Sequence, residues 1–289
     1  MKLISIIVPC YNEQEVLPLF YNEIQKIISG MQSEHKELEF ELLFINDGSK
    51  DNTLMQLREM AKNDERVRYI SFSRNFGKEA GMYAGLENAK GDYVVIMDAD
   101  LQHPPEFIPE MYKYVTEQGY DCATTRRVSR KGESKIRSVF SRMFYNLSNR
   151  FTDVDLVQGA VDFRIMTRQM VDSVLSLAER QRFSKGIFAW VGFRTKWIPY
   201  KNVERIMGKS KWSFWGLFKY AIDGITAFSV APLRTVTFMG SVISFLAFIY
   251  IIFTLIQTFV YGIVVPGYVT TLCAVLFLGG IIELSIGIL

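Results

Sequence analysis

The C-terminal end of the chain has almost no charged residues. Glu283 is the only Asp, Glu, Lys or Arg between Thr235 and Leu289, although the 289 residues include 33 basic and 30 acidic ones. Two apolar runs, at 236–261 and 268–289, are each long enough to cross a bilayer as a helix. We therefore expect two C-terminal transmembrane helices within 235–289. The alternative is a helical hairpin buried in a large soluble domain.

Cysteine is also scarce, and this excludes two classes of protein. Cys10, Cys122 and Cys273 are odd in number and scattered, without the spacing of metal ligands. A disulfide scaffold and a cysteine-rich zinc domain are therefore excluded, and reduced, mostly buried thiols are expected. The apolar stretch in the first ten residues is too short for a secretory signal peptide. A composition of 49% hydrophobic residues also excludes a disordered or collagen-like chain.

The positions of the basic residues predict how the chain is oriented in a membrane. The connector at 262–267 has no Lys or Arg, whereas four basic residues precede the first apolar run: Lys209, Lys211, Lys219 and Arg234. The positive-inside rule places the large N-terminal domain in the cytoplasm and the connector outside. We thus expect a multi-pass protein of the cell membrane. The abrupt apolar end leads us to expect that the natural protein continues beyond Leu289.

Glu283 bears on assembly. A carboxylate within an apolar run is costly in lipid, so it is expected to face another helix or to lie near the membrane surface. Contact with a helix of a second copy would make the protein a homo-oligomer, which the sequence leaves open.

The N-terminal part has the alternating pattern of an α/β domain. Short apolar, β-rich runs at 3–8, 41–45, 67–72, 93–97 and 122–125 predict buried strands. Helical patterns at 16–29, 52–63, 79–89 and 105–118 lie between them. Such alternation predicts a mostly parallel sheet with helices on both faces. Ligands of these sheets bind beyond the carboxyl ends of the strands.

Polar clusters occur at these strand ends. They are 9–13, 46–51, 73–78, 98–103 and 126–127. A single one, such as the Asp47-Gly48-Ser49 turn before a helix, is better explained by ordinary turn and cap chemistry. A series at successive strand ends is hard to explain by packing, so we interpret it as a ligand site.

Asp98 and Asp100 directly follow the strand at 93–97 and form a candidate metal site. With Gln102 they make a set of hard oxygen ligands suited to Mg²⁺ or Mn²⁺ held together with a diphosphate. An Asp-x-Asp triplet also arises by chance, as Asp153 and Asp155 show. The alternative is a solvated acidic turn. We expect His103 to be a neighbour of the site rather than a ligand.

Six stretches together resemble the polyisoprenyl-phosphate glycosyltransferases of GT-A family 2, which include dolichol-phosphate mannose synthase and the bactoprenol glucosyltransferases. They are IIVPCYNE at 6–13, NDGSKDNT at 46–53, SRNFGKEAG at 73–81, VIMDADLQHPPE at 95–106, GAVDFRIM at 159–166 and ERIMGKSKW at 204–212. The resemblance implies a GT-A catalytic domain. It also implies metal-dependent, inverting transfer of a sugar from a UDP-sugar to a polyisoprenyl phosphate.

The resemblance also implies roles for residues in the matching stretches. For the nucleotide these are Pro9, Tyr11, Glu13, Asp47, Lys78 and Asp98, and for the metal Asp98, Asp100 and Gln102. Asp100 and Asp162 are the implied catalytic residues. The implied residues for diphosphate and acceptor phosphate are Arg126, Arg137, Arg205 and Lys211. Val161 stands where the family usually has Gly, and Asn46 where many members have Asp.

Two basic, amphipathic segments, at 125–150 and within 204–234, predict contact with lipid. Residues 125–150 contain eight Lys and Arg against one acid, and apolar residues recur there at helical spacing. We divide the chain into a catalytic domain at 1–203, with an amphipathic helix at about 134–151. An acceptor loop and juxtamembrane helix follow at 204–234, and the anchor at 235–289. Core packing is the alternative for the first helix. A nucleic-acid partner is not expected, because no such motif is present.

Several activities remain open from the sequence alone. Glucose is the sugar favoured by the resemblance, with N-acetylglucosamine and galactose as competitors. A processive polysaccharide synthase would normally have a Gln-x-x-Arg-Trp motif, which Gln181-Arg182-Phe183 does not supply. A nucleotidyltransferase and a catalytically silent membrane scaffold are the remaining alternatives.

Overall fold

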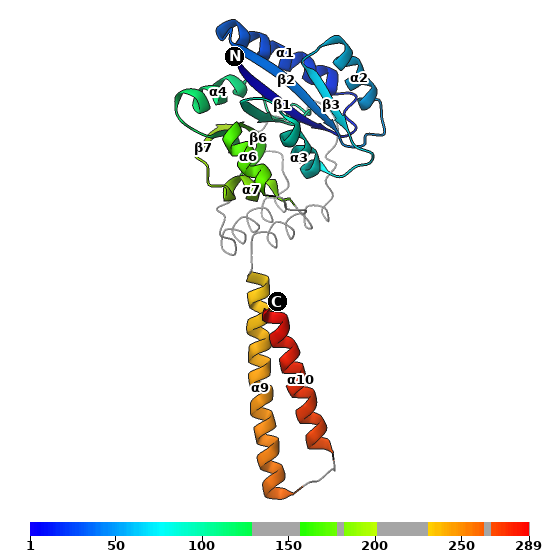
Figure 1. Cartoon of the computed structure of the whole chain (residues 1–289), viewed down its shortest axis with the longest axis vertical. Coiled ribbons are helices and arrows are strands. Elements are labelled where there is room, and N and C mark those ends of the chain that lie inside the picture. The colour runs from blue at the N-terminus through cyan, green and yellow to red at the C-terminus, as the bar shows by residue number, and fades with distance from the viewer. Residues whose placement is uncertain (129–156, 178–181, 201–230, 263–266, 289) are drawn as a thin grey trace. The chain divides into compact units, whose positions relative to one another are not determined.

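The computed structural model describes residues 1–128, 157–177, 182–200, 231–262 and 267–288 (Figure 1). The chain divides into two compact units. One is formed by residues 1–150 and 154–227, and the other by residues 151–153 and 228–289. The predicted amphipathic helix at 134–151 and most of the segment at 204–234 lie outside the described residues.

The described part of the N-terminal unit is built on a seven-stranded sheet with the order β3-β2-β1-β4-β6-β5-β7. Its strands are β1 (Lys2–Cys10), β2 (Leu38–Asn46), β3 (Val67–Ser71), β4 (Tyr93–Ile96), β5 (Cys122–Arg127), β6 (Ala160–Thr167) and β7 (Thr195–Tyr200). Only β6 runs antiparallel to its neighbours, β4 and β5. The remaining pairs are parallel. The expected α/β fold with a mostly parallel sheet is therefore confirmed.

Helices cover both faces of this sheet. They are α1 (Leu17–Glu34), α2 (Thr53–Asn63), α3 (Lys78–Asn88), α4 (Phe107–Glu117), α6 (Arg168–Ser176) and α7 (Ser184–Trp190). Alternate residues of a strand point to opposite faces. Ile4, Ile6 and Val8 of β1 accordingly share a core with α1 and α4, while Ile7 lies against Gly85 of α3.

The apolar face of α1 shows how the core is filled. Its buried residues follow one another at steps of three and four: Leu17, Phe20, Ile24, Ile28 and Met31. That spacing keeps them on one side of a helix. Burying each such side chain contributes about 1.5–3 kcal/mol. The sheet edge beyond these packed layers is therefore a rigid base for a site.

The five predicted strands and four predicted helices are present, with shifted ends. β2 begins three residues before its predicted start, because the polar Glu41 is buried at its centre by hydrogen bonds from Ser5 and Arg68. α3 begins at Lys78, one residue earlier than predicted. Four elements were not predicted at all: β6, α6, α7 and β7. The first of them, β6, is the antiparallel strand, and the simple β–α alternation ends there.

The C-terminal unit contains α9 (Ala231–Tyr261) and α10 (Tyr268–Ile288), which pack against each other. Within α9, the 25 residues Thr237–Tyr261 contain an 18-residue stretch with a mean hydropathy of 2.4, so this part of the helix is long and apolar enough to cross a membrane. In α10 the described apolar stretch, Val269–Ile282, is shorter than a span. Among the described residues one spanning helix is therefore supported, and the predicted second span is not confirmed. Cys273 of α10 is half-buried, whereas Cys10 and Cys122 are buried as expected.

Candidate active site

The sheet brings the predicted polar clusters to one edge. β3, β2, β1 and β4 are adjacent and parallel, so the segments after their carboxyl ends lie side by side. The backbone amide of Asp47 donates to the carbonyl of Cys10 at 2.9 Å, which ties the ends of β2 and β1 together. The side chains predicted to form the site are therefore gathered by the order of the strands.

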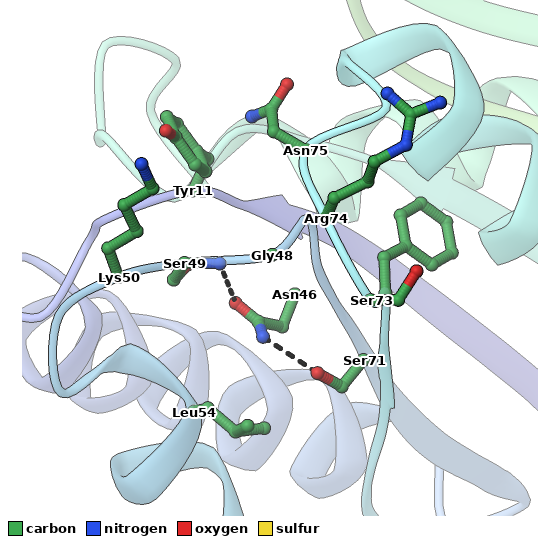
Figure 2. A pocket seen from close by; sticks show the side chains of 11 residues that line it. Tyr11, Asn46, Gly48, Ser49, Lys50, Leu54, Ser71, Ser73, Arg74 and Asn75 are labelled. Atoms are coloured by element: carbon green, nitrogen blue, oxygen red, sulfur yellow. Dashed lines mark hydrogen bonds between the residues drawn. The ribbon is translucent and has the colours of Figure 1, made fainter.

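A polar pocket of about 480 Å³ lies at this edge (Figure 2). Asn46 holds its floor, because its side-chain amide donates to Ser71 Oγ at 2.9 Å and its oxygen accepts from the Ser49 amide at 3.2 Å. The lining comes from the ends of β1, β2 and β3 and from α2: Tyr11, Asn46, Gly48, Ser49, Lys50, Leu54, Ser71, Phe72, Ser73, Arg74 and Asn75. Such a mixture of hydroxyl, amide, aromatic and cationic groups suits a polar ligand with a flat ring.

Only one of the six residues assigned to the nucleotide lines this pocket in the described part of the chain. Tyr11 does, whereas Pro9, Glu13 and Asp47 stand in the same loops outside the described lining. The Glu13 amide donates to Thr53 Oγ1 at 2.9 Å, which links the first loop to the start of α2. Ser73, Arg74 and Asn75 belong to the polar cluster at 73–78, but no individual role was assigned to them from the sequence. Ser71 is the last residue of β3 and lies inside the predicted strand, so nothing in the sequence marked it as a site residue.

Asp47 organises the neighbouring loop. Its side chain is buried, and its two carboxylate oxygens accept the backbone amides of Phe76 at 2.6 Å and Gly77 at 2.9 Å. Gly77 has a φ of 95°, a conformation that favours glycine. Asp47 thereby fixes the backbone that immediately precedes Lys78.

Lys78 joins two carboxylates from neighbouring strands. Its ammonium lies 2.7 Å from Oδ1 and 2.8 Å from Oδ2 of Asp98, and 2.6 Å from Oδ2 of Asp162. In the β4–β6 pairing, Ile96 lies opposite Arg164. Because the strands are antiparallel, the register continued by two residues sets Asp98 opposite Asp162. Two carboxylates facing each other repel, and the ammonium between them offsets that repulsion.

The pKa shifts follow from this arrangement. Burial works to raise the pKa of Asp162, but the charges of Lys78 and Lys185 outweigh it and hold that pKa well below its ordinary value. Burial likewise works to lower the pKa of Lys78, and the charges of Asp162 and Asp98 raise it above its ordinary value. Both groups are therefore charged at neutral pH. A carboxylate that is so hard to protonate is a poor general base.

Asp100 and Gln102 lie in a tight turn after Asp98. The Gln102 amide donates to Asp100 Oδ1 at 3.1 Å, and Leu101 between them has a φ of 53°. Among the described residues, no three His, Cys, Asp or Glu side chains converge as a metal site. Two carboxylates suit Mg²⁺ or Mn²⁺, which take one or two protein carboxylates and complete their shell with phosphate oxygens and water. These residues therefore fit a divalent ion bound together with a diphosphate.

His103 is buried behind this turn. Its Nδ1 lies 2.8 Å from the Tyr200 hydroxyl, and its ring stacks on Phe163 with 6.0 Å between centroids. Burial lowers the pKa of His103 despite the nearby carboxylates of Asp98 and Asp100. A neutral, packed imidazole fits the expected role of a neighbour to the site.

The second half of the domain makes contacts that hold the site in place and that the sequence did not predict. Glu79, next to Lys78, accepts hydrogen bonds from the amide and hydroxyl of Ser184 at the start of α7. The buried Arg164 guanidinium lies 3.7 Å from the Phe188 ring centroid and donates to the Val161 carbonyl at 3.0 Å. These contacts fix α3 and α7 around Asp162.

The predicted acceptor residues are only partly described. Arg126 is exposed near the end of β5. Arg137, Arg205 and Lys211 lie outside the described residues. The acceptor assignment therefore stays a prediction.

Comparison with known proteins identifies the family of this chain. Residues 5–175 match the model of glycosyl transferase family 2. The chain is 39% identical over 286 residues to the prophage bactoprenol glucosyl transferase homolog of Escherichia coli (strain K12), covering 99% of this chain and 92% of that one. It is also 39% identical over 286 residues to the bactoprenol glucosyl transferase of Shigella phage SfV, covering 99% and 91%.

A solved structure with the same fold supports the architecture. Glucosyl-3-phosphoglycerate synthase from Mycobacterium tuberculosis, in complex with Mn²⁺, UDP-glucose and phosphoglyceric acid, matches with a TM-score of 0.52 at 18% identity and covers 76% of each chain. At that identity the likeness concerns the fold, which is of the GT-A type. Taken with the family match and the near full-length relatives, it shows that the chain is a glycosyltransferase and belongs to glycosyl transferase family 2.

Proposed function

We propose that this glycosyltransferase transfers glucose from UDP-glucose to a polyisoprenyl phosphate at the cytoplasmic face of the membrane. The observation that carries the proposal is the facing pair Asp98 and Asp162, joined through residues 73–78 to a polar pocket at the same sheet edge. The names of the relatives support a lipid phosphate acceptor and glucose. The ligands of the solved neighbour support a UDP-sugar and a divalent ion.

The polar pocket would bind the nucleotide. Tyr11 offers an aromatic face and Asn46 and Ser71 offer hydrogen-bonding groups near the ends of β1, β2 and β3. Lys50 and Arg74 add positive charge at the rim, which favours a polyanionic donor. The diphosphate would then extend toward Asp98.

Asp98 and Asp100 would hold the metal, which leaves the Asp162 carboxylate for the acceptor. Asp98 and Asp100 would hold Mg²⁺ or Mn²⁺, with Gln102 beside them, and the ion would supply charge neutralisation of the departing UDP. A phosphate monoester is mostly dianionic at neutral pH because its second pKa is about 6. The acceptor oxygen therefore attacks the anomeric carbon without a strong base, and the configuration inverts.

Asp162 would position the acceptor rather than remove a proton. Its depressed pKa keeps it ionised, and its partner Lys78 carries positive charge toward the phosphates. Arg126, Arg137, Arg205 and Lys211 would bind the acceptor phosphate and reduce repulsion between the two substrates, since guanidinium groups form forked hydrogen bonds with phosphate.

Membrane attachment follows from the substrate. α9 would anchor the catalytic domain, and α10 would return across the bilayer as a second span, giving a multi-pass protein. The catalytic unit would comprise residues 1–203, and residues 204–234 would form the acceptor loop and juxtamembrane helix. The basic residues before α9 would keep this domain on the cytoplasmic side.

Transfer of radiolabel tests the proposal. Purified full-length protein in detergent is supplied with undecaprenyl phosphate, Mn²⁺ and labelled UDP-glucose, UDP-N-acetylglucosamine or UDP-galactose. We expect label from UDP-glucose to enter the organic phase only when the lipid is present, and Asp98→Asn to reduce the rate by about 100-fold or more. Undiminished turnover by Asp98→Asn, with normal metal dependence, would overturn the metal assignment. Labelling with another donor would replace glucose, and no labelling with any donor would contradict the proposed activity.

A further inference from the structure

Lys78 occupies the same carboxylate oxygens that a metal would use. The ammonium lies within 2.8 Å of both oxygens of Asp98, whose side chain is 27% exposed. A divalent cation at contact distance from Asp98 would therefore meet a second positive charge. At such distances two cations repel strongly even in a partly solvated site.

The backbone at Lys78 is fixed, so a change of its ion pairs would involve the side chain alone. The two preceding amides bind Asp47, and the following residue, Glu79, binds Ser184. Lysine has a flexible stem of four carbons, so the ammonium is able to leave Asp98 and stay near Asp162 without movement of α3. A diphosphate entering beside the metal would compensate the charge of the released ammonium.

We propose that Lys78 is an internal competitor for the metal, which holds Asp98 until a nucleotide diphosphate arrives together with the divalent ion. The inference rests on the proposed role of Asp98 as a metal ligand. Its consequence is reciprocal coupling: the metal binds weakly alone and tightly with the diphosphate, and the diphosphate gains the same factor from the metal. Removing the charge of Lys78 then strengthens binding of the metal alone.

Binding of Mn²⁺ alone provides a readout that is independent of turnover. Free Mn²⁺ is measured by electron paramagnetic resonance during titration of the full-length protein in detergent, with and without UDP. We expect Lys78→Met to bind Mn²⁺ roughly tenfold more tightly than the wild type without UDP, within the usual range of coupling between sites. UDP is expected to improve Mn²⁺ binding less in this variant than in the wild type.

Matched variants separate the possible failures. Lys78→Arg keeps the charge and is expected to bind Mn²⁺ as weakly as the wild type. Lys78→Gln removes the charge but keeps a hydrogen-bond donor, and it is expected to bind Mn²⁺ as tightly as Lys78→Met. It replaces Lys78→Met in the test if that variant fails to fold. Unchanged or weaker Mn²⁺ binding by the neutral variants, with binding abolished in Asp98→Asn, would overturn the competitor role alone. Wild-type Mn²⁺ binding by Asp98→Asn would instead overturn the metal assignment of the proposed function.

Discussion

At the scale of single residues, the site depends on one ammonium group placed between two carboxylates. Asp98 and Asp162 face each other across β4 and β6, and the Lys78 ammonium contacts both within 2.8 Å. Both carboxylates form an ion pair with the same ammonium, and the lowered pKa of Asp162 makes that residue a poor general base. The chemistry this favours is positioning and charge compensation, which suits an acceptor that is already anionic.

Asp162→Asn distinguishes positioning from proton transfer. Burial raises the pKa of Asp162, but Lys78 and Lys185 more than offset it, so the group stays ionised through the neutral range. We expect the rate to rise with pH through about 6, the second pKa of the acceptor phosphate, in both the wild type and the variant. The plateau of the variant should fall by about 100-fold, because a misplaced reactant loses a factor of this order. Loss of the inflection in the pH–kcat/KM profile of Asp162→Asn would show that Asp162 is the base.

The carboxylate of Asp64, which lies outside the site, contributes to the stability of the fold rather than to the chemistry. Asp64 accepts hydrogen bonds from Arg66, Tyr21 and Gln25, and so connects α1 with the turn between α2 and β3. Hydrogen bonds from Arg66 are the main reason that the pKa of Asp64 is lowered to about 2, from an ordinary value of 3.8. A depressed pKa stabilises the folded state above pH 3.8, and the contribution is lost as the pH falls through about 2.

Asp64→Asn is expected to reduce the free energy of unfolding at neutral pH by roughly 1–2 kcal/mol, a figure reduced for the exposure of Arg66. Urea unfolding in detergent, followed by fluorescence at several pH values, should show the difference from the wild type shrinking between pH 3.8 and about 2. Asp172→Asn is a matched control, since Asp172 is 63% exposed and lies 3.9 Å from its partner Arg168. A difference for Asp64→Asn that is independent of pH would contradict this account.

At the scale of elements, two loops form the pocket by close contact of their backbones. Gly48 has a φ of 64°, and a Cβ there would lie 2.7 Å from the Asn75 nitrogen and closer still to the Arg74 carbonyl carbon. The loop after β2 therefore needs glycine in order to pack against the loop after β3. Asp47 binds the same loop through the amides of Phe76 and Gly77.

Gly48→Ala is expected to lower the stability of the fold by about 1–3 kcal/mol, because both backbone strain and a steric clash oppose it. It should also weaken UDP binding, measured by calorimetry, since the two loops line the pocket. Gly30→Ala is the control, because Gly30 lies in α1 with open space around it and alanine there favours the helix by about 0.5–1 kcal/mol. Normal UDP binding and stability in Gly48→Ala would show that the loop contact is not needed.

Much of this architecture follows from local sequence patterns. Each of the first five strands is an apolar run, and each is followed by a polar cluster, so the parallel half of the sheet and its ligand edge were predictable. The metal candidates Asp98 and Asp100 were identified from their position after a buried strand. Residue spacing was sufficient there because each strand and helix is a local unit.

The remainder depends on contacts between distant segments. Lys78 meets Asp162 across 84 positions, and Glu79 meets Ser184 across 105. Asp162 faces Asp98 only because β6 inserts antiparallel beside β4, and no local pattern signals that pairing. Lys78 was assigned to the nucleotide from the resemblance of residues 73–81, and its contacts with Asp98 and Asp162 could not be predicted from the sequence.

At the scale of the whole molecule, a catalytic unit is joined to an apolar helix. Most large side chains of α9 are exposed, including Phe238 at 70% and Phe259 at 96%. An apolar surface of this extent marks a membrane or protein interaction site, and the length of α9 favours a bilayer. Under the proposed function, such an anchor would bring the active site to an acceptor that is confined to the membrane surface.

Cysteine labelling in intact cells tests the proposed orientation. Tyr261 at the end of α9 is 79% exposed, and Lys36 is exposed in the catalytic unit. We expect a membrane-impermeant maleimide to label Tyr261→Cys directly, and Lys36→Cys only after the membrane is permeabilised. Both substitutions are made in a Cys273→Ser background, because Cys273 is half-buried whereas Cys10 and Cys122 are buried, and the Cys273→Ser chain alone gives the background labelling. Direct labelling of Lys36→Cys with protection of Tyr261→Cys would reverse the topology.

The proposed reaction passes a sugar from UDP to the phosphate of a polyisoprenyl lipid, and its phosphorus-containing products identify it. Phosphorus NMR of a reaction containing UDP-glucose, Mn²⁺ and undecaprenyl phosphate follows every phosphorus atom at once. We expect the monoester signal of the lipid to be replaced by a phosphodiester signal while UDP appears in equal amount. An unchanged lipid signal, or release of UMP with formation of a lipid diphosphate, would contradict it.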